Sequence, residues 1–226
     1  LGIPAEPLFR SRDESQAGEA YILALAYEAF HPEIDVTAIN QSKHTVEIHE
    51  ADGRNDLLQQ VENGALTVVR SYQALGRLYR GIICNNVRQY VLLGDAAAMT
   101  DGEAGNADDR WIFTEDNPMR ELSTAAELAG ASRVLRGFND ALAAECLQIA
   151  ETVYAQTKAE GWLEALKLQT AVELYLATKQ QIYLDFVLAH QKMVIDGISR
   201  SGWFMTRLMK QLATSKDKQV ISRSGE

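Results

Sequence analysis

Apolar residues recur at helical spacing over most of the chain, so the pattern predicts a protein built mainly of helices. The run at 21–30 is apolar on nearly every side, and it follows a capping box in which Ser11 stands three residues before Glu14. His31-Pro32 should end this helix, because a residue that precedes proline is disfavoured in the helical region. We expect helices over residues 14–30, 56–79, 124–136, 140–158, 162–177, 182–197 and 203–213.

Local signals also predict where later helices begin and which faces they bury. Thr124 and Thr178 each stand three residues before a glutamate or glutamine, as in a capping box, and Asn139 follows a turn at Gly137. Apolar residues spaced by four and three positions predict a buried stripe on two helices. The stripe residues are Leu142, Cys146, Ile149, Val153, Ile182, Phe186 and Met193. Truncating Phe186 to alanine should cost about 3–5 kcal/mol if the ring is fully enclosed.

Two long segments interrupt the helical pattern. Residues 32–53 are polar apart from an alternating stretch at 45–49, which predicts one exposed strand. Residues 81–119 are rich in glycine, asparagine and aspartate but carry aromatic residues, and a loop of this length is usually functional. We therefore expect an all-α fold, in which one domain of antiparallel helical hairpins carries 32–53 and 81–119 as long loops. Periodicity does not separate an open superhelix from an arc of a closed ring.

Composition and charge exclude several classes of function. Of the 226 residues, 46% are hydrophobic and 23% charged, as in globular proteins, and no apolar run is long enough to span a membrane. The net charge is −9 and the basic residues are scattered, which argues against a nucleic-acid partner. No signal peptide opens the sequence, and nothing in it indicates a cofactor. We expect Cys84, in a loop, and Cys146, on a buried stripe, to be unpaired.

The four histidines do not indicate a metal site. His31, His44, His49 and His190 share no ligand spacing with one another or with the cysteines, so we predict no metal ligands. We interpret His190 as a partly exposed residue on a helix. The sequence also lacks the Gly-x-Ser-x-Gly nucleophile elbow, which argues against an α/β-hydrolase.

The segment 106–114 carries the most informative chemistry. Asp109, Arg110 and Trp111 place a carboxylate, a guanidinium and an indole next to one another in a long loop. Proteins grip sugars with such groups, because an aromatic face stacks on the ring while charged side chains hydrogen-bond the hydroxyls. In the alternative interpretation, Asp109 and Arg110 form a salt bridge within the loop and Trp111 packs on the helices.

Several segments resemble a known family. They are GDAAAMTDG at 94–102, DDRWIFT at 108–114 and STAAELAGASRVL at 123–135, with weaker matches at 14–21 and 171–184. Together they resemble the middle of a family-nine glycoside hydrolase, over about residues 12–190. The resemblance implies an arc of an (α/α)6 barrel, which is built from six helical hairpins. It also implies the cleavage of β-linked glucans or related oligosaccharides, in most members by inversion.

The chain departs from this family where the catalytic carboxylates should lie. The Asp-Ala-Gly-Asp motif that supplies the water-activating base should precede Glu14, but LFRSRD stands there at 8–13. The family's late histidine-arginine segment and its general-acid glutamate lie beyond the helices at Tyr183 and Trp203. We therefore expect part of a longer catalytic domain, or a degenerate relative, that lacks the catalytic carboxylates. The sequence therefore does not identify the catalytic residues.

Two functions remain open at this point. The first is an endoglucanase-like or cellulase-like glycoside hydrolase in which Asp109, Arg110 and Trp111 line a subsite for a β-linked oligosaccharide or polysaccharide. The resemblance then implies a secreted or periplasmic location. The second is a helical-hairpin interaction module that binds protein on its concave face without catalysis. Composition does not discriminate between them, but the aromatic and acidic loop favours the first.

Overall fold

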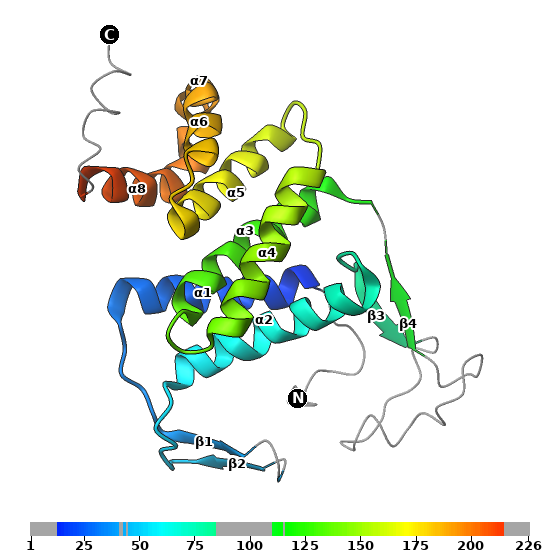
Figure 1. The fold of residues 1–226 in the computed structure, drawn as a ribbon, viewed down its shortest axis with the longest axis vertical. Coiled ribbons are helices and arrows are strands. Elements are labelled where there is room, and N and C mark those ends of the chain that lie inside the picture. The colour runs from blue at the N-terminus through cyan, green and yellow to red at the C-terminus, as the bar shows by residue number, and fades with distance from the viewer. Residues whose placement is uncertain (1–12, 41–42, 44, 85–109, 115, 215–226) are drawn as a thin grey trace.

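The computed structural model describes residues 13–40, 43, 45–84, 110–114 and 116–214, which form eight helices and two pairs of short strands (Figure 1). The helices are α1 (Asp13–Phe30), α2 (Asp56–Leu75), α3 (Pro118–Leu135), α4 (Asp140–Gln156), α5 (Leu163–Thr178), α6 (Gln181–Ala189), α7 (Gln191–Asp196) and α8 (Ile198–Thr214). The strands are β1 (Thr37–Asn40), β2 (Thr45–Ile48), β3 (Gly81–Cys84) and β4 (Arg110–Phe113).

Successive helices pair into hairpins that lie side by side. Helix α1 packs with α2, α3 with α4, and α5 with α6, while α3 also contacts both α1 and α5. Helix α8 packs back against α5 at one end of the structure (Figure 1). We call α1, α3 and α5 the inner helices. This arrangement confirms the prediction of an all-α fold built from packed helical hairpins.

Helix α3 lies between the other two inner helices and is buried along most of its length. Its run of alanine and glycine leaves little side-chain bulk, so neighbouring helices approach closely. A Cβ atom at Gly130 would lie only 2.3 Å from the ring of Tyr21 on α1. Buried side chains of the three inner helices join those of α2 and α4 in one hydrophobic core. The core therefore holds the inner helices in a fixed relation to one another.

Asparagine side chains define where three of the helices begin. Asn55, Asn117 and Asn139 accept hydrogen bonds from amides in the first turns of α2, α3 and α4. The predicted cap at Asn139 is confirmed. The capping box at Thr124 is wrong, because α3 already begins at Pro118 and buries Thr124 inside the helix.

Two other predicted helix boundaries also need correction. Thr178 is the last residue of α5, and the helix that follows has no side-chain cap, so the capping box expected there is absent. The helix predicted over 56–79 ends at Leu75. Gly76 adopts a left-handed conformation with φ of 70° and donates its N–H to the carbonyl oxygen of Tyr72, which stops the helix.

The two predicted apolar stripes have different outcomes. The stripe of α4 is confirmed, because Leu142, Cys146, Ile149 and Val153 are all buried. The second stripe is wrong at Ile182, which is 64% exposed, while Phe186 and Met193 are only partly buried. The helix expected over 182–197 breaks at His190 into α6 and α7, so one stripe does not continue through it. Helix α6 instead buries Tyr183, Leu184 and Val187.

Short strands pair within both segments that interrupt the helices. The predicted strand at 45–49 is confirmed as β2, and it pairs antiparallel with β1, which the pattern did not predict. Strands β3 and β4 pair antiparallel with Cys84 opposite Arg110. Cys146 is free and buried, as expected. Burial, followed by the charge of Glu145, raises the pKa of its thiol to about 12.

Candidate functional site

The residues predicted to bind sugar lie just before the inner helix α3. Arg110 and Trp111 are the first two residues of β4, opposite Cys84 and Ile83 of β3. Asp109 lies outside the described residues, and so do the side chains of Arg110 and Trp111. Strand β4 ends at Phe113, four residues before the Asn117 cap of α3, and so places the backbone of Arg110 and Trp111 ahead of that helix. That the three side chains together bind sugar remains a prediction.

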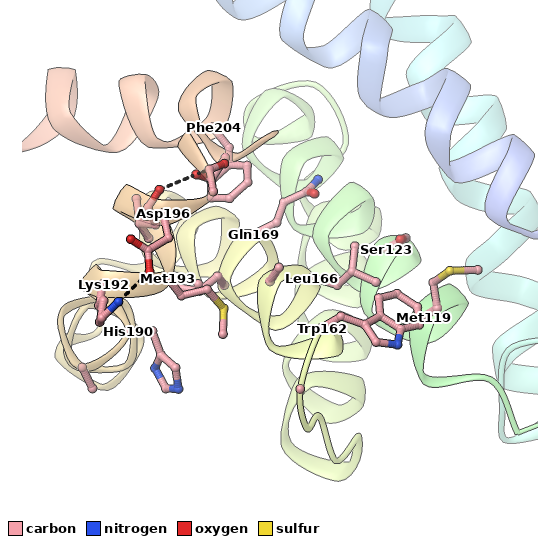
Figure 2. A pocket seen from close by; sticks show the side chains of 17 residues that line it. Met119, Ser123, Trp162, Leu166, Gln169, His190, Lys192, Met193, Asp196 and Phe204 are labelled. Atoms are coloured by element: carbon pink, nitrogen blue, oxygen red, sulfur yellow. Dashed lines mark hydrogen bonds and ion pairs between the residues drawn. The ribbon is translucent and has the colours of Figure 1, made fainter. Parts of the chain in front are cut away.

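A groove of about 930 Å³ opens beside the N-terminal halves of α3 and α5 (Figure 2). Its opposite wall comes from α7, the start of α8 and the residues just before α7. This volume lies within the range of about 300–1,000 Å³ that is typical of small-molecule sites. The side chains used below are Met119, Ser123, Trp162, Gln169, His190, Lys192 and Asp196.

Trp162 stands at the rim of the groove, immediately before α5. Gly161 turns the chain there with φ of 63°, a conformation that favours glycine. The carbonyl oxygen of Trp162 accepts the amide of Ala165 at 3.3 Å, which anchors its backbone to the first turn. The side chain is nevertheless exposed, and Figure 2 shows its indole beside Met119.

His190 contributes an oriented imidazole to the groove at the break between α6 and α7. Its Nδ1 lies 2.8 Å from the carbonyl oxygen of Phe186, and its ring packs on the Phe186 ring with centroids 4.2 Å apart. Because a carbonyl oxygen only accepts, Nδ1 must donate, which leaves Nε2 of the neutral ring as an acceptor. The residue is partly exposed, as predicted, although it separates two helices instead of lying within one.

The charges along the groove cancel one another. Lys192 and Asp196 lie one helical turn apart on α7, with Nζ and Oδ2 at 2.7 Å. Both side chains are largely exposed, so this pair adds little to stability. It does leave the groove without net charge from these two residues.

Four charged side chains form a closed ring toward the C-terminal ends of the inner helices. Glu28 of α1, Arg133 of α3, Glu173 of α5 and Arg207 of α8 alternate in sign, and we call them the ionic ring. Arg133 binds Glu28 at 2.6 Å and Glu173 at 2.7 Å. Arg207 binds Glu28 at 2.6 Å and also contacts Glu173. The ring therefore joins four helices through its ion pairs.

Hydrogen bonds complete the ionic ring at its buried carboxylate. The Glu173 side chain is fully buried, and the Tyr21 hydroxyl donates to its Oε1 at 2.8 Å. Burial, reinforced by the Glu173 charge, raises the pKa of the Tyr21 phenol far above its ordinary value. The phenol thus stays a donor. Burial acts to raise the pKa of Glu28, but hydrogen bonds and charge from Arg133 and then Arg207 outweigh it and lower the pKa.

The ionic ring does not have the properties of a catalytic carboxylate pair. A glycosidase needs a general acid that is protonated near its working pH, which calls for a raised pKa. The pKa of Glu28 is lowered, and Glu173 is held by two guanidinium groups. Asp196, the carboxylate on the groove, is paired with Lys192. We therefore assign the ring a structural role.

Sequence reasoning missed both the ionic ring and the groove. One signal for the ring was present in the sequence, because the charged residue Glu173 interrupts an otherwise apolar run between Val172 and Leu174. Its arginine partners lie 34 and 40 positions away along the chain, so spacing within one helix could not identify them. A signal for the groove was Trp162 directly after Gly161, at the start of an inner helix.

Comparison with known proteins finds similarity at the level of structure. No protein-family profile matches the chain, and no curated protein matches its sequence. A metagenome-derived glycoside hydrolase family 9 endoglucanase matches with a TM-score of 0.58 and 18% identity, over 81% of this chain and 34% of that one. A Bacteroides ovatus family 9 glycoside hydrolase matches with a TM-score of 0.57 and 15% identity, over 80% and 35%.

A third solved structure covers more of the chain. The endoglucanase of the termite Nasutitermes takasagoensis matches with a TM-score of 0.53 and 15% identity, over 95% of this chain and 50% of that one. At such low identity the likeness concerns the fold. It confirms at that level the resemblance to family-nine glycoside hydrolases and the arc of helical hairpins. The chain spans between a third and a half of these proteins.

The described residues offer neither a metal-binding cluster nor a membrane-spanning helix. No cluster of three or more histidine, cysteine, aspartate or glutamate side chains there is placed to hold a metal ion. None of the described helices is long and apolar enough to cross a membrane.

Proposed function

We propose that this chain forms part of the substrate-binding surface of a β-glucan hydrolase. The observation that carries the proposal is the structural match to glycoside hydrolase family 9 enzymes, two of them endoglucanases, over about four fifths of the chain or more. A secreted or periplasmic location is part of the same proposal and rests on the resemblance alone.

Asp109, Arg110 and Trp111 would form a sugar subsite at the N-terminal end of α3. The indole of Trp111 would stack on the face of a glucosyl ring, while the two charged side chains would hydrogen-bond its hydroxyl groups. Arg110 and Trp111 open β4, which ends four residues before the Asn117 cap, and this position supports the assignment. A short strand paired with β3 gives the subsite a backbone support that a free loop lacks.

The proposal assigns binding, and not acid–base chemistry, to the described residues. Inversion requires two carboxyl groups about 6.5–9.5 Å apart, one to protonate the leaving oxygen and one to activate water. The carboxylates of the ionic ring are neutralised by arginines, and Asp196 is paired with Lys192. We propose that the catalytic acid and base lie elsewhere in a longer enzyme, so that this chain binds β-glucan without cleaving it.

Calorimetry and a reducing-sugar assay test this proposal together. We expect the purified chain to bind cellotetraose and to release no reducing ends from β-glucan above background. Trp111→Ala should weaken binding and leave the helical circular dichroism signal unchanged. Binding would be refuted by a folded chain that releases no heat with cellotetraose at millimolar concentration. The division between binding and chemistry would be refuted by turnover, which would place a catalytic carboxylate within this chain.

A further inference from the structure

We infer that the groove beside α3 and α5 binds a neutral β-linked oligosaccharide, with Trp162 as its stacking platform. This inference rests on the proposed function and deepens it, because it names a sugar-binding residue in addition to those predicted at 109–111. Trp162 was not among the residues that the sequence pattern or the resemblance assigned to sugar binding. The exposure of Trp162, its neighbours and the charge of the groove support this role.

The exposure of Trp162 is consistent with a role in ligand binding. Its side chain is 68% exposed, although tryptophan is among the residues that gain most from burial. Within the described residues, its ring takes no part in the aromatic contacts that engage Trp203 with Tyr21 and Phe204. An exposed indole beside Met119, on the rim of a groove, offers a flat apolar face at small cost in conformational entropy.

Polar groups in the groove complement the apolar platform. The hydroxyl of Ser123 and the amide of Gln169 line the groove and make no hydrogen bond to the rest of the described chain. Gln169 lies on α5 two turns beyond Trp162 (Figure 2). With Nε2 of His190 as an acceptor, the groove offers donors and acceptors to sugar hydroxyls. A sugar combines apolar C–H faces with a rim of hydroxyl groups and matches both features.

The charge of the groove selects among sugars. Lys192 and Asp196 are its charged pair, and their ion pair at 2.7 Å leaves no net charge. An acidic polysaccharide would need an unpaired cation, which the described groove does not offer. The structure therefore favours a neutral glycan over a uronic-acid polymer. Flat β-linked glucosyl units suit one exposed indole face better than the coiled chain of an α-linked glucan.

The test compares two tryptophans in the complete chain by isothermal titration calorimetry with cellotetraose. Trp162→Ala should lower the affinity about 10-fold or more, as removal of a central aromatic contact commonly does. Trp162→Phe should recover part of the loss. Trp203→Ala is the matched control, because Trp203 is also partly exposed but packs on Tyr21 and does not itself line the groove, and it should change affinity less than about 2-fold. Maltotetraose should bind at least about 10-fold more weakly than cellotetraose.

Each contrary result has a distinct meaning. If the unmodified chain binds and Trp162→Ala binds equally well, the role of Trp162 is refuted, while the proposed function stands. If Trp203→Ala loses as much affinity as Trp162→Ala at equal helical content, the groove is not the binding site. If the folded, unmodified chain binds no cellotetraose, the proposed function fails, and this inference fails with it.

Discussion

The ionic ring and the groove lie toward opposite ends of the inner helices and use polar groups in opposite ways. In the ring, each carboxylate meets two guanidinium groups, and Tyr21 adds a donor to Glu173. In the groove, an indole, a hydroxyl and an amide face open space. The charged groups of the ring are paired with one another, whereas the polar groups of the groove remain available to a ligand.

This difference separates groups that hold the fold from groups that can serve a ligand. A buried charge costs several kcal/mol unless it is paired, so the members of the ring depend on one another. A partly exposed polar group is satisfied by water and can exchange that water for a ligand. Substitutions in the ring should therefore change stability, and substitutions in the groove should change binding.

The largest effect is expected at the buried carboxylate of the ring. Glu173→Gln leaves two arginines with one carboxylate between them and should cost about 3–5 kcal/mol of unfolding free energy. Urea denaturation followed by circular dichroism measures this loss. Lys192→Met, which breaks an exposed ion pair, is the control and should change stability by less than about 0.5 kcal/mol. Equal costs for the two variants would show that the ring is not a structural centre.

A second substitution tests the close packing behind the ring. Gly130→Ala places a Cβ atom 2.3 Å from the Tyr21 ring and should cost about 1–3 kcal/mol, because the ring must move away. Gly202→Ala on α8 meets only ordinary contacts at 3.8 Å and serves as the control. It should be neutral or stabilising by about 0.5–1 kcal/mol. A Gly130→Ala variant as stable as the original chain would contradict the packing of Tyr21 on α3.

The pH dependence of stability tests Glu28, the partly exposed carboxylate of the ring. Glu28 has a lowered pKa, so its contribution is complete above the unfolded pKa of about 4.3 and disappears as pH falls through the folded pKa. We expect Glu28→Gln to cost about 1 kcal/mol at pH 7, with a smaller difference from the original chain below about pH 4. Urea denaturation at pH 7, 4 and 3 measures this. A difference that grows toward acid pH would contradict the assignment.

The smallest effect on stability is expected in the groove. Trp162→Ala removes an exposed side chain and should change the unfolding free energy by less than about 0.5 kcal/mol. The same denaturation experiment checks this value. A loss above about 2 kcal/mol would mean that the indole supports the fold, and the contrast between groove and ring would then fail.

Sequence patterns predicted the helices well where local chemistry decides them. Asn139 caps α4 through bonds within its own first turn, and the stripe from Leu142 to Val153 follows from the period of one helix. The pattern failed where contacts between helices determine the helix start or the burial of a side chain. Thr124 has the form of a cap, but α3 starts six residues earlier, and packing by α1 and α5 buries it. Ile182 has the right spacing but is exposed, because α6 buries its neighbours Tyr183 and Leu184 instead.

The candidate site was less predictable for a physical reason. The side chains of the loop predicted a sugar subsite at 109–111, and the structure sets the described part of it beside β3, a partner more than twenty residues away in sequence. The ionic ring joins residues as far as 179 positions apart, and the groove combines side chains of α3, α5 and α7. Such groups come together only when the helices pack, so no local spacing records them.

A titration of the ¹⁵N-labelled chain with cellotetraose, followed by nuclear magnetic resonance, tests the central claim most directly. The chain has three tryptophans, so three indole N–H signals report on the β4 segment, the groove and the Tyr21 contact of α8. Tryptophan-to-phenylalanine variants assign the signals. We predict that the Trp162 signal shifts in a saturable way while the Trp203 signal stays in place. A titration that shifts Trp203 and leaves Trp162 unmoved would contradict the separation of a binding groove from a structural ring.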